Sequence, residues 1–247
     1  MLKSASGQFV KRVLLDRDSV PSFDEYPFCI PAVRNLHDLT LHPKVTYFVG
    51  DNGTGKSTLL EAIAVKIGFN AEGGSRSFNF STRASHSNLH EYLKLAKGTT
   101  MPKDHYFLRA ESFYNVATEA DNLKLYTTES YGFMSLHEQS HGESFFTLMT
   151  KRFRGNGLYL LDEPEAALSP TRQMSVLTIM HNLIRKNSQF IIVTHSPIIL
   201  AYPDSAIYLF SDDAITQVEY TETEHYTVTR DFLNRRERLL EILLSDD

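Results

Sequence analysis

The sequence predicts an α/β fold in which a mostly parallel β-sheet carries helices on both faces. Two observations support this prediction. Two short runs, Leu158 to Leu161 and Phe190 to Thr194, are apolar enough to be strands buried on both faces of a sheet. Segments of this kind alternate along the chain with segments whose apolar residues recur at helical spacing. Such alternation is typical of a parallel sheet between two layers of helices.

The best-defined unit is a strand, a glycine-rich turn and a helix, in that order. Val45 to Val49 is a β-branched and aromatic run that ends at Gly50, which predicts a buried strand. Apolar residues then recur at helical spacing from Leu59 to Ile67, and Gly68 is a residue type that ends helices.

The remaining elements are predicted from the same patterns. Prolines between Pro21 and Pro43 predict extended or looped chain, and the glycine- and serine-rich stretch from Gly73 to Asn88 predicts a loop. We expect further strands and helices in this order: strands at Phe9 to Asp16, His105 to Arg109, Ile207 to Phe210 and Ile215 to Tyr220; helices at Glu91 to Lys97, Gly142 to Arg154, Thr171 to Lys186 and Phe232 to Leu244.

Length and composition are those of one ordinary globular unit. At 247 residues the chain is long enough for one α/β domain, so we expect a single domain over residues 1–247. The formal net charge of −5 gives no overall basic field of the kind that attracts nucleic acid or an acidic membrane. No segment approaches the ~18 consecutive apolar residues of a membrane span, and the start of the chain lacks a secretory signal. We therefore expect a cytoplasmic protein with no membrane segment.

The turn between the first buried strand and its helix is a phosphate-binding loop (P-loop), Gly50 to Ser57. It matches G-x-x-x-x-G-K-[ST] at every position. Gly53 and Gly55 let the backbone approach phosphates, and the helix behind them points its positive end at the same place. Lys56 has the length to reach the β- and γ-phosphates, and the Ser57 hydroxyl can ligate Mg²⁺. A chance Gly/Ser-rich turn is the alternative, but the flanking strand and helix disfavour it.

Asp162 and Glu163 follow the apolar run Leu158 to Leu161. An acidic residue at the end of a buried strand beside a P-loop can hold Mg²⁺ through its water shell, which suits Asp162. The next carboxylate, Glu163, can orient or deprotonate an attacking water. An ordinary acidic turn is the alternative; the P-loop upstream favours the magnesium site.

Two further segments are candidates for the same site. His195 follows the second apolar run, at the edge of the sheet where α/β proteins bind ligands, although most histidines have structural roles. Ser140 stands three positions before Glu143, ahead of an apolar helix, which by itself is a capping box.

These segments together resemble the ATP-binding cassette (ABC) ATPase family. Gly50 to Thr58 is similar to its Walker A motif, Ser140 to Glu143 to its signature, and Leu158 to Glu163 to its Walker B motif. Ala167 to Ser169 corresponds to the D-loop and His195 to the switch histidine. Within the family the chain looks most like short, soluble ATPases related to the RecF, SMC and Rad50 group.

The resemblance implies an ABC-type ATPase head that has a small N-terminal antiparallel β part and, at about 70–140, a helical insert carrying the signature. It implies hydrolysis of MgATP between two copies of the chain in an ATP-dependent, head-to-tail homodimer that acts on DNA or on a partner protein. The implied catalytic residues are Glu163, His195 and Lys56, and the implied metal ligands are Ser57 and Asp162. The implied nucleotide-binding residues are Asn52, Gly53, Thr54, Gly55, Lys56, Ser57, Thr58 and, from the partner copy, Ser140 and Gly142.

The chain departs from the family pattern at three places. His141 replaces the first glycine of the signature, the D-loop has Ser169 and Pro170 in place of its aspartate, and Glu111 is the one candidate for the missing Q-loop glutamine. Two other functions therefore stay open: the ATPase subunit of a membrane transporter, and a nucleotide-gated switch with little turnover.

Overall fold

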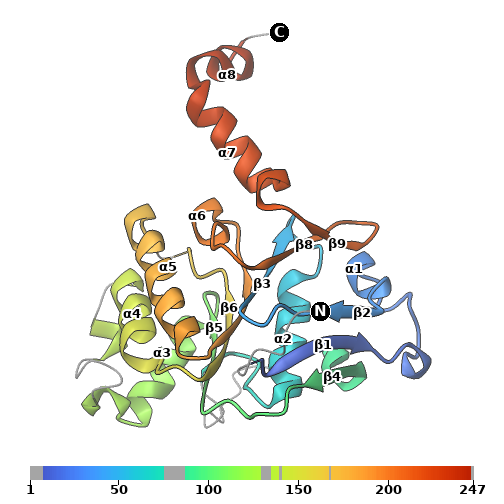
Figure 1. Cartoon of the computed structure of the whole chain (residues 1–247), viewed down its shortest axis with the longest axis vertical. Coiled ribbons are helices and arrows are strands. Elements are labelled where there is room, and N and C mark those ends of the chain that lie inside the picture. The colour runs from blue at the N-terminus through green and yellow to red at the C-terminus, as the bar shows by residue number, and fades with distance from the viewer. Residues whose placement is uncertain (1–7, 75–86, 129–134, 139–140, 167, 246–247) are drawn as a thin grey trace.

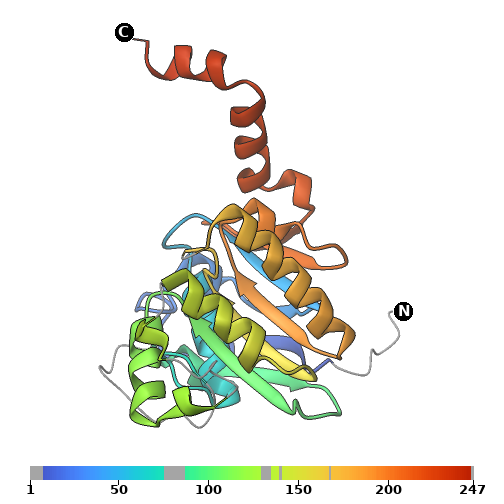
Figure 2. The same cartoon turned by 90° about the vertical axis from the view of Figure 1, so that its left-hand side faces the viewer.

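The computed structural model describes residues 8–74, 87–128, 135–138, 141–166 and 168–245. A six-stranded sheet lies at the centre, with a three-stranded sheet and one long helix on one face and a group of helices on the other (Figure 1). Two helices at the C-terminal end leave this body and project from it (Figure 2).

The central sheet has the strand order β5-β6-β7-β3-β8-β9. Its first five strands pair in parallel and only the pair β8–β9 is antiparallel. All residues of β3, β6 and β7 are buried, as their apolar sequences predicted. The bounds are β3 (Val45–Gly50), β5 (Asp104–Arg109), β6 (Gly157–Asp162), β7 (Gln189–Val193), β8 (Ala206–Phe210) and β9 (Ile215–Val218). The predicted mostly parallel α/β sheet is confirmed.

The second sheet is antiparallel and joins β1 (Val10–Leu15), β2 (Asp38–Thr40) and β4 (Leu93–Lys97) in the order β2-β1-β4. The small antiparallel part implied by the resemblance is thus confirmed. Its third strand, β4, comes from the middle of the chain. The prediction of a helix at Glu91 to Lys97 was wrong. A 3-10 turn (Asn88–Tyr92) precedes β4, whose backbone pairs with β1 over Val10 to Leu15. Pairing with β1 provides this segment with hydrogen bonds that a helix of this length could not secure alone.

One helix covers the face of the central sheet that meets the small sheet, and several cover the other. The long helix α2 (Lys56–Ile67) ends at Gly68, which is left-handed (φ 104°), as predicted. The opposite face is covered by α3 (Phe113–Asn122), α4 (His141–Thr147), α5 (Pro170–Arg185) and α6 (Pro197–Leu200). The helix predicted from Gly142 to Arg154 changes at Leu148 into a π-helical turn (Leu148–Arg152), and the proline-rich segment contains the short helix α1 (Pro31–Arg34) besides β2.

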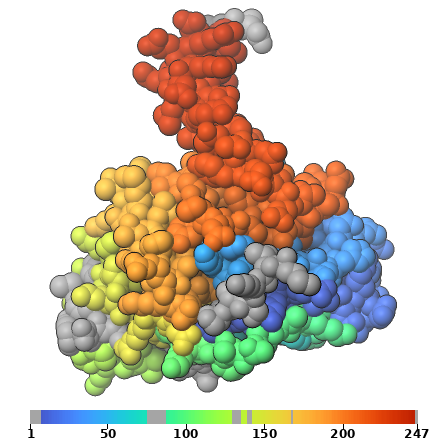
Figure 3. Space-filling model, viewed as in Figure 1, coloured from blue at the N-terminus to red at the C-terminus, as the bar shows by residue number. Residues whose placement is uncertain are grey.

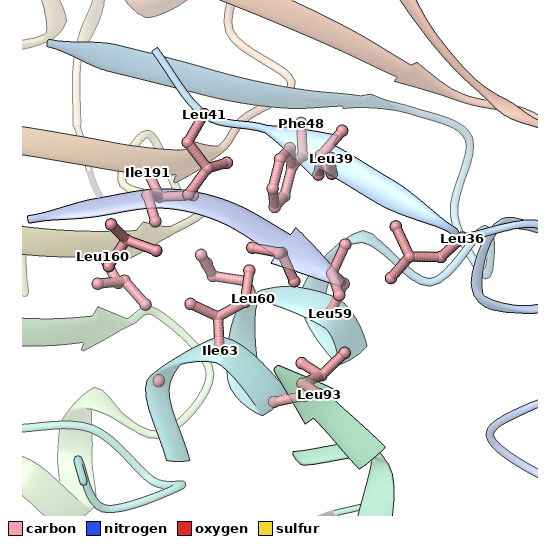
Figure 4. Packing of buried hydrophobic residues seen from close by; sticks show 14 of the residues in the cluster. Leu36, Leu39, Leu41, Phe48, Leu59, Leu60, Ile63, Leu93, Leu160 and Ile191 are labelled. Carbon is pink, nitrogen blue, oxygen red and sulfur yellow. The ribbon is translucent and has the colours of Figure 1, made fainter. Parts of the chain in front are cut away.

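Two hydrophobic clusters fill the space on either side of the central sheet. Successive residues of β3 alternate between them, so that Tyr47 packs with the α3–α6 layer and Phe48 packs with α2 and the small sheet. Figure 4 shows the second cluster, where Leu59, Leu60 and Ile63 of α2 lie beneath the strands. Burial on both faces explains why these strands read as continuous apolar runs.

The projecting C-terminal arm consists of α7 (Glu224–Asn234) and α8 (Arg236–Leu243). No residue of either helix is buried, and the space-filling view shows the arm standing clear of the body (Figure 3). The prediction placed one helix from Phe232 to Leu244. The structure has two helices because Arg235 leaves the helical conformation (φ −131°, ψ 32°). Among the described residues, no helix has the length and apolarity to cross a membrane.

A buried glutamine ties the two sheets together. Gln189, the first residue of β7, accepts hydrogen bonds from the backbone N–H groups of Phe9 (2.9 Å) and Val10 (3.0 Å). Its amide nitrogen donates to the carbonyls of Val10 (2.7 Å) and His42 (3.1 Å). One fully buried side chain therefore satisfies backbone groups at the start of β1 and in the turn before β3.

We predict that Gln189→Leu lowers the free energy of unfolding by about 2–4 kcal/mol, because it leaves several backbone groups buried without partners. Gln217→Leu, on the exposed side of β9, is the matched control and should change stability by no more than ~0.5 kcal/mol. Urea denaturation followed by circular dichroism measures both. Equal effects of the two substitutions would contradict the role given to Gln189.

Candidate nucleotide site

Four neighbouring parallel strands bring functional side chains to one edge of the central sheet. In-register pairing of β5 with β6 places Arg109 opposite Asp162, and pairing of β6 with β7 places Asp162 opposite Val193. The P-loop starts at the same edge, where β3 ends at Gly50. The carboxyl ends of parallel strands are where α/β folds bind ligands.

The P-loop has the backbone conformation that its glycines allow. Gly50, Gly53 and Gly55 all have positive φ (130°, 83° and 95°). A Cβ on Gly50 would lie 2.2 Å from the carbonyl oxygen of Phe210, whereas a Cβ on Gly53 would meet no atom within 4 Å. Gly50 is thus required by the neighbouring strand β8, and Gly53 leaves its backbone open for a ligand to approach.

Lys56 lies folded back over the P-loop. Its Nζ donates to the carbonyl oxygens of Gly50 (2.7 Å) and Asp51 (2.6 Å), and the side chain is buried. Burial lowers the pKa of Lys56, while Glu163, Asp51 and Asp162 act to raise it. These acidic neighbours favour the charged ammonium, which is the form that attracts phosphate. The other predicted loop residues differ in exposure: Asn52 is exposed, Thr54 is buried, and Thr58 is half-buried in the first turn of α2.

Ser57 and Asp162, the two residues predicted as metal ligands, contact each other directly. The Ser57 hydroxyl donates to Oδ1 of Asp162 at 2.9 Å. Both residues line a hollow together with Ala110, Glu111 and Glu163. These are hydroxyl and carboxylate oxygens, the ligands that Mg²⁺ prefers, and one or two protein ligands suffice for an ion that keeps its waters and binds phosphates. The residues present therefore fit Mg²⁺.

An ion-pair cluster that the sequence did not predict supports Asp162. Arg109 donates to Oε2 of Glu61 on α2 (2.6 Å) and to Oε2 of Glu111 (3.1 Å), and its Nε lies 3.6 Å from Oδ2 of Asp162. Burial raises the pKa of Asp162 to about 6, against the opposing effects of Arg109 and Ser57. Glu61 lies on a helix outside any recognisable motif, so only the tertiary contact between α2 and the end of β5 reveals its role.

Glu163 stands at the start of the turn after β6 with a positive φ of 51°. A left-handed conformation costs a residue that has a Cβ about 1–2 kcal/mol, and such strain tends to occur at functional sites. The carboxylate is partly exposed, and its Oε1 lies 3.8 Å from Nε2 of His195. The structure thus places Glu163 beside His195, in the same hollow as Asp162.

His195 is held by two residues that the motifs did not identify. Its backbone N–H donates to the carboxylate of Glu165, which also accepts from the Thr194 hydroxyl at 2.8 Å. Its ring Nδ1 lies 3.0 Å from Nε2 of His225 in the first turn of α7. Burial lowers the pKa of His225, and His195 and Lys56 lower it further. No sequence signal relates His225 to the site, because it lies on a C-terminal helix with no recognisable motif.

The predicted signature lies apart from these residues. Gly142 is in the first turn of α4, on the β5 side of the sheet, with β6 and β7 between β5 and the P-loop strand β3 (Figure 1). Ser140 and the D-loop residue Ala167 lie outside the described residues. Lys56, Ser57, Asp162, Glu163 and His195 form what we call the strand-end site. Among the described residues, no three His, Cys, Asp or Glu side chains form a group that could hold a metal by themselves.

A family model described as "AAA domain, putative AbiEii toxin, Type IV TA system" matches residues 72–201. In sequence, the chain is 25% identical over 173 residues to the nucleoside import ATP-binding protein NupA of Lactococcus lactis subsp. cremoris (strain MG1363). That match covers 60% of this chain and 32% of the relative, so the chain spans about a third of the length of the curated relative it matches.

The fold is similar to that of cbiO1 from Clostridium perfringens, part of the ABC transporter complex cbiONQ. The TM-score is 0.50 at 15% identity, with 96% of this chain and 99% of that chain covered. The SMC head domain from Thermotoga maritima aligns with a TM-score of 0.45 at 16% identity, over 85% of this chain and 99% of that one. The expected ABC-type ATPase fold is confirmed.

We predict that Asp162→Asn stabilises the nucleotide-free protein near pH 7.5 by about 1–3 kcal/mol. The folded-state pKa of Asp162, about 6, exceeds its ordinary value of 3.8, so the buried carboxylate lowers stability as pH rises through 6. The asparagine side chain carries no charge, so the cost of burying a carboxylate disappears. Its amide oxygen can still accept the hydrogen bond from the Ser57 hydroxyl. Denaturant unfolding should show the gain near pH 7.5 and little of it near pH 4, where Asp162 is protonated. The exposed control Asp213→Asn should show no such difference; loss of stability in Asp162→Asn near pH 7.5 would contradict the prediction.

Proposed function

Because this chain belongs to the AAA-domain family matched above and is an ATPase with the ABC-type fold, we propose that it binds MgATP on its P-loop and hydrolyses it at the strand-end site. The observation that carries the proposal is the convergence of Lys56, the Ser57–Asp162 pair and Glu163 at the carboxyl ends of β3 and β6, two parallel strands with β7 between them. The lysine ammonium, the proposed metal ligands and the proposed base are thereby brought together beside the P-loop.

Each residue has a role that follows from its position. The exposed backbone around Gly53 receives the phosphates, and Lys56 exchanges one of its two carbonyl contacts for a phosphate oxygen. Ser57 and Asp162 would hold Mg²⁺, which when bound would neutralise charge that develops on the phosphate oxygens. Glu163 is exposed enough to meet a water molecule and accepts its proton as the water attacks. His195, within 3.8 Å of that carboxylate, orients the water or the transferred phosphoryl group.

We propose that two copies pair head to tail in the presence of ATP, with Ser140 and Gly142 of one copy facing the ATP of the other. The position of α4 on the β5 side of the sheet, away from β3 of its own copy, supports this arrangement. In this proposal residues 1–247 form a single domain. The closing of the two copies on ATP is coupled to action on DNA or on a partner protein.

A second function has support from one observation. The curated relative is by its name a nucleoside import ATP-binding protein, so a role as the ATPase subunit of a transporter fits the same site. Co-purification with a membrane protein that has several spans would favour the transporter role. Hydrolysis stimulated several-fold by DNA, measured at low salt, would favour action on DNA.

We predict that Glu163→Gln lowers ATP turnover by at least ~100-fold, because the amide cannot accept the proton of the attacking water. Binding of ATP should persist, and the variant should accumulate as an ATP-bound dimer. A phosphate-release assay measures turnover, and light scattering with and without ATP measures mass. Glu241→Gln, an exposed change on α8, is the matched control and should behave as the wild type.

Three outcomes would contradict the proposal. Wild-type protein with Mg²⁺ that releases no phosphate lacks the proposed activity. Unchanged turnover in Glu163→Gln removes Glu163 as the base. A dimer that forms equally without ATP contradicts nucleotide-dependent closure. If hydrolysis in a single turnover is far slower than the release of nucleotide, the protein is instead a nucleotide-gated switch.

A further inference from the structure

We propose that the base of the C-terminal arm completes the nucleotide site, with His225 of α7 acting as a positioning residue for His195. The inference rests on the role of His195 proposed above. Nδ1 of His195 and Nε2 of His225 are 3.0 Å apart, and their rings lie at 45° with centroids separated by 5.1 Å. The distance is that of a hydrogen bond between the two imidazoles.

His225 also lies against the P-loop. Together with Gly50, Asp51 and Thr54 it lines a hollow beside the loop. The charges of Lys56 and Asp51 reach it across this hollow, and Glu224 acts on it from its own helix. His225 therefore lines the nucleotide site from α7, the first helix of the C-terminal arm.

The contacts of His195 leave one ring atom available for chemistry. Glu165 accepts from its backbone N–H, and His225 occupies Nδ1. The remaining atom, Nε2, faces Oε1 of Glu163 at 3.8 Å. A ring fixed at its backbone and at Nδ1 presents Nε2 in one direction.

His225 sets the tautomer of His195 as well as its orientation. In a neutral imidazole one nitrogen carries the proton and the other accepts. When Nε2–H of His225 donates to Nδ1 of His195, the proton of His195 is placed on Nε2, beside the Glu163 carboxylate. The reverse arrangement would put the lone pair of Nε2 against that carboxylate, which is electrostatically unfavourable. Residues behind a functional histidine commonly fix its tautomer in this way.

The arm contacts the body at its root, next to His225. At its root the Tyr220 hydroxyl donates to the carbonyl of Pro197 (3.0 Å), Tyr220 packs against Tyr226 (centroids 4.7 Å apart) and Thr223 is buried. Beyond the root, no residue of α7 or α8 is buried (Figure 3). These contacts hold the first turn of α7 against the body, and so hold His225 against His195.

The first test is spectroscopic and needs no nucleotide. In the full chain, ¹⁵N shifts of the imidazole of His195, assigned by loss of its signals in His195→Gln, report which nitrogen carries the proton. We expect the Nε2–H form in the wild type and in His225→Gln, whose amide also donates. His225→Leu, which cannot donate, should give a mixture of tautomers. Unchanged His195 shifts in His225→Leu would overturn the proposal.

The second test is kinetic. His225→Leu should lower kcat about 10- to 100-fold and change KM by less than about twofold, and His225→Gln should recover most of the loss. Leu233→Ser, on the exposed part of α7, is the matched control and should turn over as the wild type. Equal losses in His225→Leu and His225→Gln, or in Leu233→Ser, would overturn the proposal. If the wild type hydrolyses no ATP, the proposed function fails, and the tautomer measurement still decides the role of His225.

Discussion

The parallel register of β5, β6, β7 and β3 is the constraint on which the rest of this molecule depends. Hydrogen bonding along these strands fixes Arg109 opposite Asp162 and Asp162 opposite Val193, and it begins the P-loop at the same edge. A shift of one residue in any strand would turn its side chains to the other face and separate the groups of the strand-end site. Burial on both faces prevents such a shift, because every residue of β3, β6 and β7 would lose its packing.

The site that this register assembles is costly to keep. Asp162 holds a charge in a buried position, Glu163 has a left-handed backbone, and Lys56 is buried with an ammonium group. Arg109, Ser57 and the P-loop carbonyls offset part of this cost through hydrogen bonds and charge. The balance leaves charged and polar groups gathered in a partly buried position at one edge of the sheet, which is typical of a functional site.

Support around the site comes from segments far apart in the chain. Glu61 on α2 holds Arg109, Glu165 holds the backbone of His195, and His225 holds its ring. Glu61 and His225 lie on helices without a recognisable motif, and Glu165 lies in a turn beside one. Their roles arise because α2, the turn after β6 and the root of α7 pack against the same sheet edge. The arm is thereby joined to the nucleotide site, although no residue of α7 or α8 is buried.

By itself the sequence determined the sheet, the P-loop and the residues at the ends of β6 and β7, because apolar runs, glycines and strand-end acids are local patterns with local causes. It could not determine β4, since the segment after Glu91 becomes a strand only by pairing with β1. It also could not reveal Arg109's bond to Glu61 or the contact of His225 with His195, which join residues 48 and 30 positions apart. Such contacts depend on how separate elements pack, and only the tertiary structure decides that.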